Sequence, residues 1–204
     1  MARKGLAKEV FIQRALDIFM ENGLRTTMDE ISHQIRVSKR TIYEQFEDKT
    51  DLVRACLACL LRNRPDLVVP KKERLMECMY NSLYANMMAF FGKPSRFLIQ
   101  VQRHYPDLYS EQVNPVIARV KEYLLALIRE SMDNGYMRTD IQTDVMLSYM
   151  LKYVFLVASD SETMFFKYPP AEIFHNTIYP AMRGMLTNEG VRRMDKAIKE
   201  ASKK

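Results

Sequence analysis

Between residues 26 and 49 the sequence gathers side chains whose chemistry suits nucleic acids. Arginine and lysine bond guanine edges, glutamine bonds adenine, and a threonine methyl group contacts thymine. Tyrosine, threonine and lysine also donate to phosphate oxygens, which position a protein on DNA without reading its sequence. This pattern predicts a double-stranded DNA partner, and a solvated charged surface is the alternative. The densest part of the stretch is Lys39, Arg40, Thr41, Tyr43 and Gln45.

Two helices are predicted ahead of this stretch. Apolar residues spaced at i, i+3, i+4 and i+7 indicate a first helix, and Gly23 suits its C-terminal end. Thr27 and Glu30 have the spacing of a capping box, so we expect a second helix over 28–35. Thr26 and Thr27 lie at its N-terminus, where free N–H groups and the helix dipole favour a phosphate.

A third helix must carry the DNA-binding side chains themselves. Ser38 suits its N-cap, the helix is predicted over 39–46, and Ile42 and Phe46 form its inward pair. A fourth helix begins at Lys49, which is placed to reach a phosphate. Two short helices joined by a tight turn, the second exposing cations and hydroxyls, form a helix-turn-helix that can enter a major groove.

A dozen spaced positions between Phe11 and Leu52 resemble the DNA-binding domain of the tetracycline-repressor (TetR) family, most clearly Val-Ser-Lys-Arg-Thr-Ile-Tyr-Glu-Gln-Phe-Glu-Asp-Lys at 37–49. The resemblance implies a ligand-responsive transcriptional regulator, most simply a repressor, with its recognition helix at 39–45. Arg36 departs from the family pattern, which usually has glycine in the turn. If the turn needs a positive φ, a residue other than glycine costs about 1 kcal/mol there. The predicted DNA-contacting residues are Thr26, Thr27, Ser38, Lys39, Arg40, Thr41, Tyr43, Gln45 and Lys49.

Composition and periodicity predict an all-α fold for the whole chain. Only 6 glycines and 8 prolines occur in 204 residues, which leaves few turns for hairpins. About nine helices are expected, of which the later ones cover 71–91, 95–104, a long stretch from Pro115 up to Gly135 that a brief helical turn near 107–112 precedes, 144–166, 171–187 and a tail over 191–204. We divide the chain into a three-helix DNA-binding domain (1–48), a connecting helix (49–64) and a larger helical domain for ligand binding and dimerisation (65–204).

Methionine and aromatic side chains in the larger domain suit a cavity that binds a small-molecule effector, because methionine repacks around varied guests. Ordinary core packing is the alternative for each of them. Phe97 and Gln100 belong to a wider set of possible cavity residues. The predicted ligand-contacting residues are Tyr84, Met88, His104, Tyr123 and Tyr153.

The resemblance also implies a homodimer, because the last two long helices of the family pair with those of a second subunit. The helix at 144–166 is apolar nearly all round, which is consistent with burial on two sides. A two-fold dimer matches a palindromic operator. A monomer with a buried core helix is the alternative.

Other classes of function have less support. The sequence contains no glycine-rich phosphate loop, no His-Glu-x-x-His and no Gly-x-Ser-x-Gly, so we expect neither an enzyme nor a cofactor. Cys56 and Cys59 have ligand-like spacing, which makes a metal- or redox-sensing DNA-binding regulator the alternative function. Both thiols share an apolar stripe with Leu52 and Ala55, however, and buried cysteines behave as small hydrophobic residues, so we predict no bound metal.

Charge and targeting signals indicate the compartment. The net charge of +6 is compatible with a nucleic-acid partner, and the odd count of 3 cysteines suits a reducing environment. The N-terminus has no apolar signal segment, and no apolar run reaches the ~18–20 residues that cross a membrane. The expectation is a cytoplasmic protein without a membrane partner.

Overall fold

The computed structural model describes residues 7–62, 67–159 and 167–201, and these residues are predominantly helical. Their only β pairing is an isolated antiparallel bridge between Met137 and Leu186, which confirms the predicted all-α fold. None of the helices in the described ranges is both long and apolar enough to cross a membrane. The helices are α1 (Lys8–Asn22), α2 (Met28–Ile35), α3 (Lys39–Tyr43), α4 (Lys49–Arg62), α5 (Leu75–Phe90), α6 (Lys93–His104), α7 (Pro106–Asp133), α8 (Thr143–Ser159), α9 (Pro170–Ile173), α10 (Tyr179–Arg183) and α11 (Asn188–Ala201).

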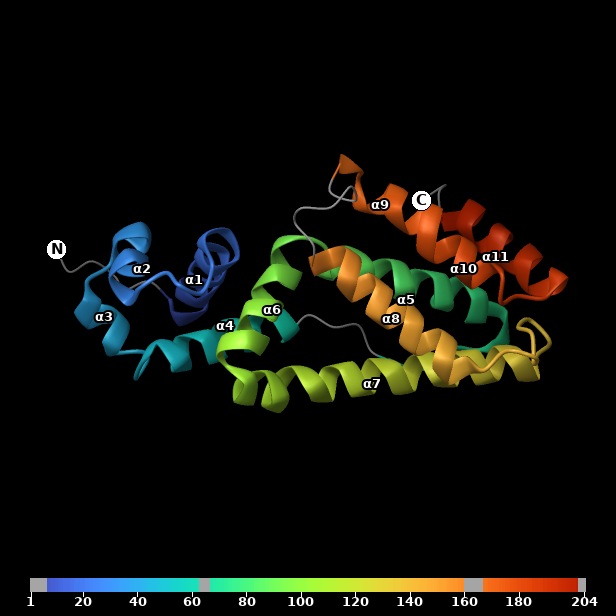
Figure 1. Ribbon diagram of the computed structural model, residues 1–204, viewed down its shortest axis with the longest axis horizontal. Helices are drawn as coiled ribbons and strands as arrows, with labels where there is room; N and C mark the ends of the chain where they lie inside the picture. The colour runs from blue at the N-terminus through green and yellow to red at the C-terminus, as the bar shows by residue number, and fades with distance from the viewer. Residues whose placement is uncertain (1–6, 63–66, 160–166, 202–204) are drawn as a thin grey trace. The chain divides into compact units, whose positions relative to one another are not determined.

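The chain forms two compact units, and the first consists of Met1–Pro65 and Lys93–Val116. Helix α1 lies against α2, α4 and α6, as Figure 1 shows. Two aromatic pairs join the elements of this unit: the Phe11 ring stacks on Phe46, and the Phe19 ring stacks on Phe97 of α6. The three N-terminal helices therefore share one core with α4 and α6.

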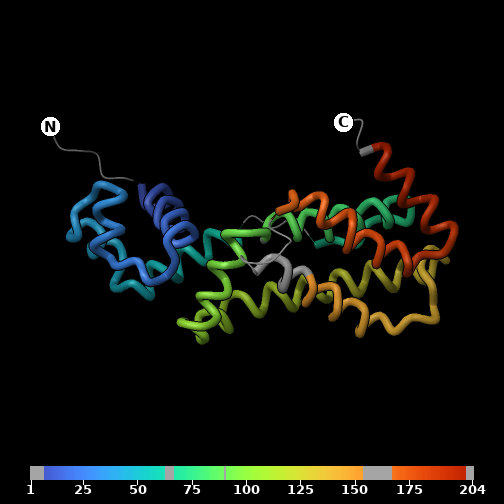
Figure 2. The backbone as a smooth tube through the Cα atoms, turned by 45° about the horizontal axis from the view of Figure 1, so that its top comes forward, coloured from blue at the N-terminus to red at the C-terminus, as the bar shows by residue number. Residues whose placement is uncertain are grey.

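The second unit consists of Asp66–Gly92 and Ile117–Lys204. Helix α5 contacts α8, α9 and α11 in this unit, and Figure 2 shows its green segment beside the orange-red and red C-terminal segments. Its buried core is rich in methionine, leucine and tyrosine from all of these helices and from α7. The second unit thus has a hydrophobic core of its own. The division of function at residues 48 and 64 stays a prediction.

Two predicted helix boundaries near the first unit are wrong. Helix α3 ends at Tyr43 rather than at residue 46, although Phe46 is buried as expected. Helix α7 begins at Pro106, not at Pro115, which lies inside it. Leu108 and Tyr109 are buried, so packing stabilises the first turns of α7 even though Pro115 has no N–H to donate a helical hydrogen bond.

One predicted helix of the second unit also needs correction. The stretch expected as one helix over 171–187 consists of α9, a π-helical segment Phe174–Ile178 and α10. Pro180 lacks an N–H and its ring crowds the carbonyl four residues earlier, which favours a wider turn just before it. Helix α8 ends at Ser159, and the last part of the predicted helix 144–166 lies outside the described residues.

Candidate nucleic-acid interface

The helix-turn-helix starts with a complete capping box at α2, as predicted. The Thr27 hydroxyl accepts a hydrogen bond from the Glu30 N–H at 3.2 Å, and a Glu30 carboxylate oxygen accepts one from the Thr27 N–H at 2.6 Å. The bonds that Thr27 donates lower the pKa of the Glu30 carboxyl group. The box defines where α2 begins and therefore where the turn after it falls.

The turn between α2 and α3 has the left-handed conformation that glycine favours. Arg36 has φ 62° and ψ 46°, the only positive φ among the described residues other than glycine. The Val37 N–H donates to the Ser32 carbonyl at 3.0 Å and closes the end of α2. The turn therefore keeps a glycine-type geometry with an arginine in it, at a cost of about 1–2 kcal/mol.

Helix α3 is capped by Ser38, whose hydroxyl accepts from the Thr41 N–H at 3.1 Å and lies 2.8 Å from the Thr41 hydroxyl. Ile42 is fully buried and anchors the helix to the rest of the unit. Tyr43 is exposed, as are Lys39 and Arg40. The structure thus presents this part of the predicted DNA-contacting set on one short helix.

Both cations of α3 are engaged in exposed ion pairs. Lys39 pairs with Asp29 of α2, and the Arg40 Nε lies 3.0 Å from the Glu44 Oε1. Exposed ion pairs contribute roughly 0–1 kcal/mol, so a phosphate or a base edge can replace either carboxylate at small cost. Whether Lys39 and Arg40 contact DNA stays a prediction.

Two residues of the predicted set are turned toward the protein. Thr26 is buried, and its hydroxyl donates to the Gly23 carbonyl at 2.8 Å. Gln45 is half-buried, and its Oε1 atom is buried with no hydrogen-bond partner among the described residues. Thr27, by contrast, is exposed at the start of α2. Whether Thr26 and Gln45 contact DNA stays a prediction.

Lys49 occupies the first position of α4 and binds back to the protein. Its Nζ donates to the Leu24 carbonyl at 2.5 Å, and burial lowers its pKa. The Leu24 N–H in turn donates to the Gln100 Oε1 of α6 at 2.7 Å. Gly23, the residue before Leu24, has φ 84°. A Cβ atom at Gly23 would lie 2.9 Å from the same Gln100 Oε1 atom. Leu24, in the turn between α1 and α2, is thus bound by Lys49 of α4 through its carbonyl and by Gln100 of α6 through its N–H.

Sequence reasoning did not predict this role of Gln100, which was assigned with Phe97 to a possible cavity. The structure places both side chains against the DNA-binding helices instead, with the Phe97 ring 6.2 Å from that of Phe19. The available signal was Gly23, since a glycine at a helix end accepts close approach from a side chain elsewhere in the chain.

The cysteine pair has the environment of core residues. Cys56 is buried and its thiol donates to the Ile12 carbonyl at 3.7 Å, while burial raises its pKa far above the ordinary value. The Cys59 thiol donates to the Gln13 Oε1 at 3.5 Å. Within the described ranges no three His, Cys, Asp or Glu residues gather as metal ligands. Nothing in this geometry supports a metal or redox sensor.

Four of the five predicted ligand-contacting residues belong to the core of the second unit. Tyr84 and Met88 on α5, Tyr123 on α7 and Tyr153 on α8 all lie in or against it. His104 lies in the first unit, at the exposed end of α6. The structure therefore brings the first four into one cluster and assigns His104 to a different unit.

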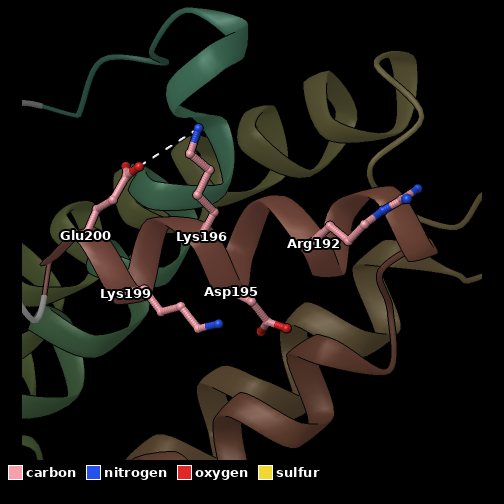
Figure 3. Close-up of a pocket in the computed structure, with 5 residues that line it drawn as sticks. All are labelled: Arg192, Asp195, Lys196, Lys199 and Glu200. Atoms are coloured by element: carbon pink, nitrogen blue, oxygen red, sulfur yellow. Dashed lines mark ion pairs between the residues drawn. The ribbon is translucent and has the colours of Figure 1, made fainter.

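A charged pocket lies on α11, away from any of these predicted residues (Figure 3). Lys196 and Glu200 form an ion pair of 3.9 Å in it, and Asp195 is bound by Arg183 and by the Tyr179 hydroxyl. Ligand pockets for small organic molecules are lined mainly by apolar groups. This pocket does not have that chemistry. Its lining residues are Arg192, Asp195, Lys196, Lys199 and Glu200.

Comparison with solved structures shows a shared fold. The ketosteroid transcriptional regulator KstR2 of Mycobacterium tuberculosis superposes with a TM-score of 0.58 at 14% identity, covering 90% of this chain and 98% of that one. GusR of Salmonella enterica gives 0.54 at 19% identity, covering 90% and 99%. A gamma-butyrolactone receptor described as an ArpA-like protein gives 0.51 at 19% identity, covering 93% and 94%.

The sequence comparisons concern the helix-turn-helix itself. No curated protein matches the chain. Residues 11–56 match the family model described as bacterial regulatory proteins, tetR family. These residues run from α1 into α4 and include the capping box, the turn and α3. Residues 11–56 of this chain are therefore a helix-turn-helix domain of the tetR family of bacterial regulatory proteins, and the chain as a whole shares the fold of these solved structures.

Proposed function

We propose that this chain is a dimeric repressor that binds a palindromic operator and is released from it by a small-molecule effector. The observation that carries the proposal is α3. Its inner residue Ile42 is buried in the first unit, while Lys39, Arg40 and Tyr43 face solvent with donors suited to base edges and phosphates. The contacts of Ser38, Thr41, Thr27 and Lys49 with DNA are part of the same proposal.

An exposed apolar surface on α8 supports the homodimer. Val145 and Tyr149 lie one helical turn apart, and 64% and 57% of their respective surfaces are exposed. Large apolar side chains gathered on one helical face mark an interaction site when they are left in water. A second copy of this chain would cover that face. Two recognition helices in such a dimer would read half-sites one turn of DNA apart, about 34–36 Å.

The core of the second unit supports a small-molecule effector. Tyr84 packs its ring edge-to-face on Phe174 with centroids 5.1 Å apart, and the Ser82 hydroxyl lies 3.5 Å from the Tyr123 hydroxyl. Aromatic and methionine side chains with a few hydroxyl groups fit an apolar guest that carries polar oxygens. Two similar structures are named for such compounds, a ketosteroid and a gamma-butyrolactone.

Release from DNA follows from linkage between the two sites. An effector that binds better to a conformation with displaced recognition helices weakens DNA affinity, and DNA weakens effector affinity by the same factor. The proposal needs no catalytic step and no cofactor. It also locates the chain in the cytoplasm, where a bacterial regulator meets DNA.

The test is selection of binding sites from a randomised duplex library with the full chain, followed by sequencing and by measurement of the mass of the selected complex. We expect an inverted repeat bound by two copies per site. Selection without enrichment would contradict operator recognition, and a single half-site bound by one copy would contradict the dimer. A screen of ketosteroids and lactones for release from the selected site then tests the effector.

A further inference from the structure

Glu44 is the C-cap residue of α3, directly after Tyr43, and its position continues the outward side of that helix. Successive helical residues are about 100° apart, so Arg40 and Glu44, two positions before and after the buried Ile42, each point about 160° away from it. Glu44 keeps helical angles (φ −71°, ψ −20°), and its N–H donates to the Arg40 carbonyl at 2.9 Å. Their side chains are 89% and 59% exposed. These two residues would therefore enter the groove deepest.

The remaining polar residues of α3 lie on its flanks. Lys39 is about 60° and Tyr43 about 100° from Ile42 on one side, and Thr41 is about 100° away on the other. Side chains on the side of a recognition helix that faces into the major groove can meet base edges, while contacts to the DNA backbone position the protein. The outward position of a carboxylate is unexpected, because phosphates repel it and most groups in the major groove are acceptors.

The carboxylate is paired rather than isolated. The Glu44 Oε1 accepts a hydrogen bond from the Arg40 Nε at 3.0 Å. The guanidinium group has five N–H donors and the carboxylate has two oxygens, so each group keeps bonding capacity after this contact. The pair thus presents donors and an acceptor side by side on the surface of α3.

A single G·C base pair offers the complementary pattern. Guanine presents its N7 and O6 acceptors in the major groove, and cytosine presents its N4 amino donor next to them. Adenine also has an amino donor, but its N7 acceptor lies next to that donor and would repel the carboxylate. We propose that Glu44 reads the operator: its carboxylate accepts from a cytosine N4 amino group while Arg40 donates to a guanine. This inference rests on the proposed function, because it assumes that α3 occupies the major groove.

The same carboxylate improves selectivity by penalising wrong sites. Where no amino group faces it, Glu44 loses solvent and meets acceptors or phosphates, which raises the free energy of that complex. Removing its charge therefore strengthens binding to unrelated DNA while it weakens discrimination at one or two operator positions. A residue that only caps the helix would show neither effect.

The experiment compares the full chain with Glu44→Gln and Glu44→Ala by measuring affinity for the selected operator and for each single base-pair replacement. Glu47→Gln is the matched control, because it removes the same charge from an exposed residue three positions away, outside α3. We expect Glu44→Ala to lower the preference for cytosine at one half-site position about five-fold or more, and Glu44→Gln to shift that preference toward adenine. Binding to a scrambled duplex should strengthen more in both variants than in the control.

Unchanged base preferences in both Glu44 variants would overturn the inference. The inference would also be overturned if Glu44→Gln and Glu47→Gln gained affinity equally for all DNA sequences, because the gain would then come from the change in net charge alone. A parent chain without any sequence preference would instead overturn the proposed function, so the two failures are distinguishable. Thermal unfolding of each variant shows whether a change in affinity comes from a damaged fold.

Discussion

Replacing Arg36 with glycine should stabilise the protein. Arg36 is held at φ 62° in the turn between α2 and α3, and its side chain is exposed. An L-residue in this region costs about 1–2 kcal/mol, and glycine avoids that cost. Glycine also gives the unfolded chain more freedom, which costs about 0.5–1 kcal/mol. The difference predicts a net gain of about 0.5–1 kcal/mol for Arg36→Gly.

Thermal unfolding followed by circular dichroism measures this gain. A stabilisation of that size raises the Tm by about 1–4 °C for a chain of this length. Exchange of the Val37 amide hydrogen reports on the turn directly, because this N–H donates to the Ser32 carbonyl. We expect slower exchange of that amide in Arg36→Gly.

Arg36→Ala is the control, because alanine keeps the left-handed strain and removes the same charge. It should leave the Tm unchanged or lower it. If Arg36→Ala raises the Tm as much as Arg36→Gly does, the gain comes from the loss of the side chain and the reasoning about φ is refuted. A lower Tm for Arg36→Gly would refute it as well.

Three further predictions concern the contacts around α3 and α4. Lys49→Ala should weaken binding to all DNA sequences similarly and reduce the slope of log affinity against log salt by roughly 1; an unchanged slope would exclude a phosphate contact. Gln100→Leu leaves the Leu24 N–H unpaired and should lower the free energy of unfolding by about 1–3 kcal/mol, whereas Gln102→Leu, at an exposed position on α6, should have little effect. Cys56 should resist a thiol reagent in the folded protein, because burial raises its pKa. Cys56→Ser should lower stability without making DNA binding sensitive to zinc or mild oxidant. If zinc or oxidant released DNA from the parent but not from Cys56→Ser, a sensor would be favoured.

The helix-turn-helix could be predicted because its determinants are local. The capping box of Thr27 and Glu30, the Ser38 cap and the inward position of Ile42 depend on residues three or four apart, and the structure confirms each. The sequence placed Arg36 in the turn but left its φ open, and the structure gives it a positive φ. Local hydrogen bonds and helical periodicity are the features that spacing along a sequence records.

The remaining features depend on contacts between distant residues. The bond between Leu24 and Gln100 joins positions 76 apart, and no local pattern indicates it. Pro115 was read as a helix start because a residue without an N–H suits the first helical position, whereas tertiary packing continues the helix back to Pro106. Glu44 was not in the predicted DNA-contacting set, although its i+4 spacing from Arg40 was an available signal.

The central claim is that α3 recognises a specific DNA sequence, and one ratio tests it most directly. The affinity of the full chain for its selected operator is divided by its affinity for a scrambled duplex at the same physiological salt concentration. We expect a ratio of about 10³ or more for the parent, with a marked fall for Arg40→Ala. A ratio near one for the parent, or an unchanged ratio for Arg40→Ala, would contradict the claim.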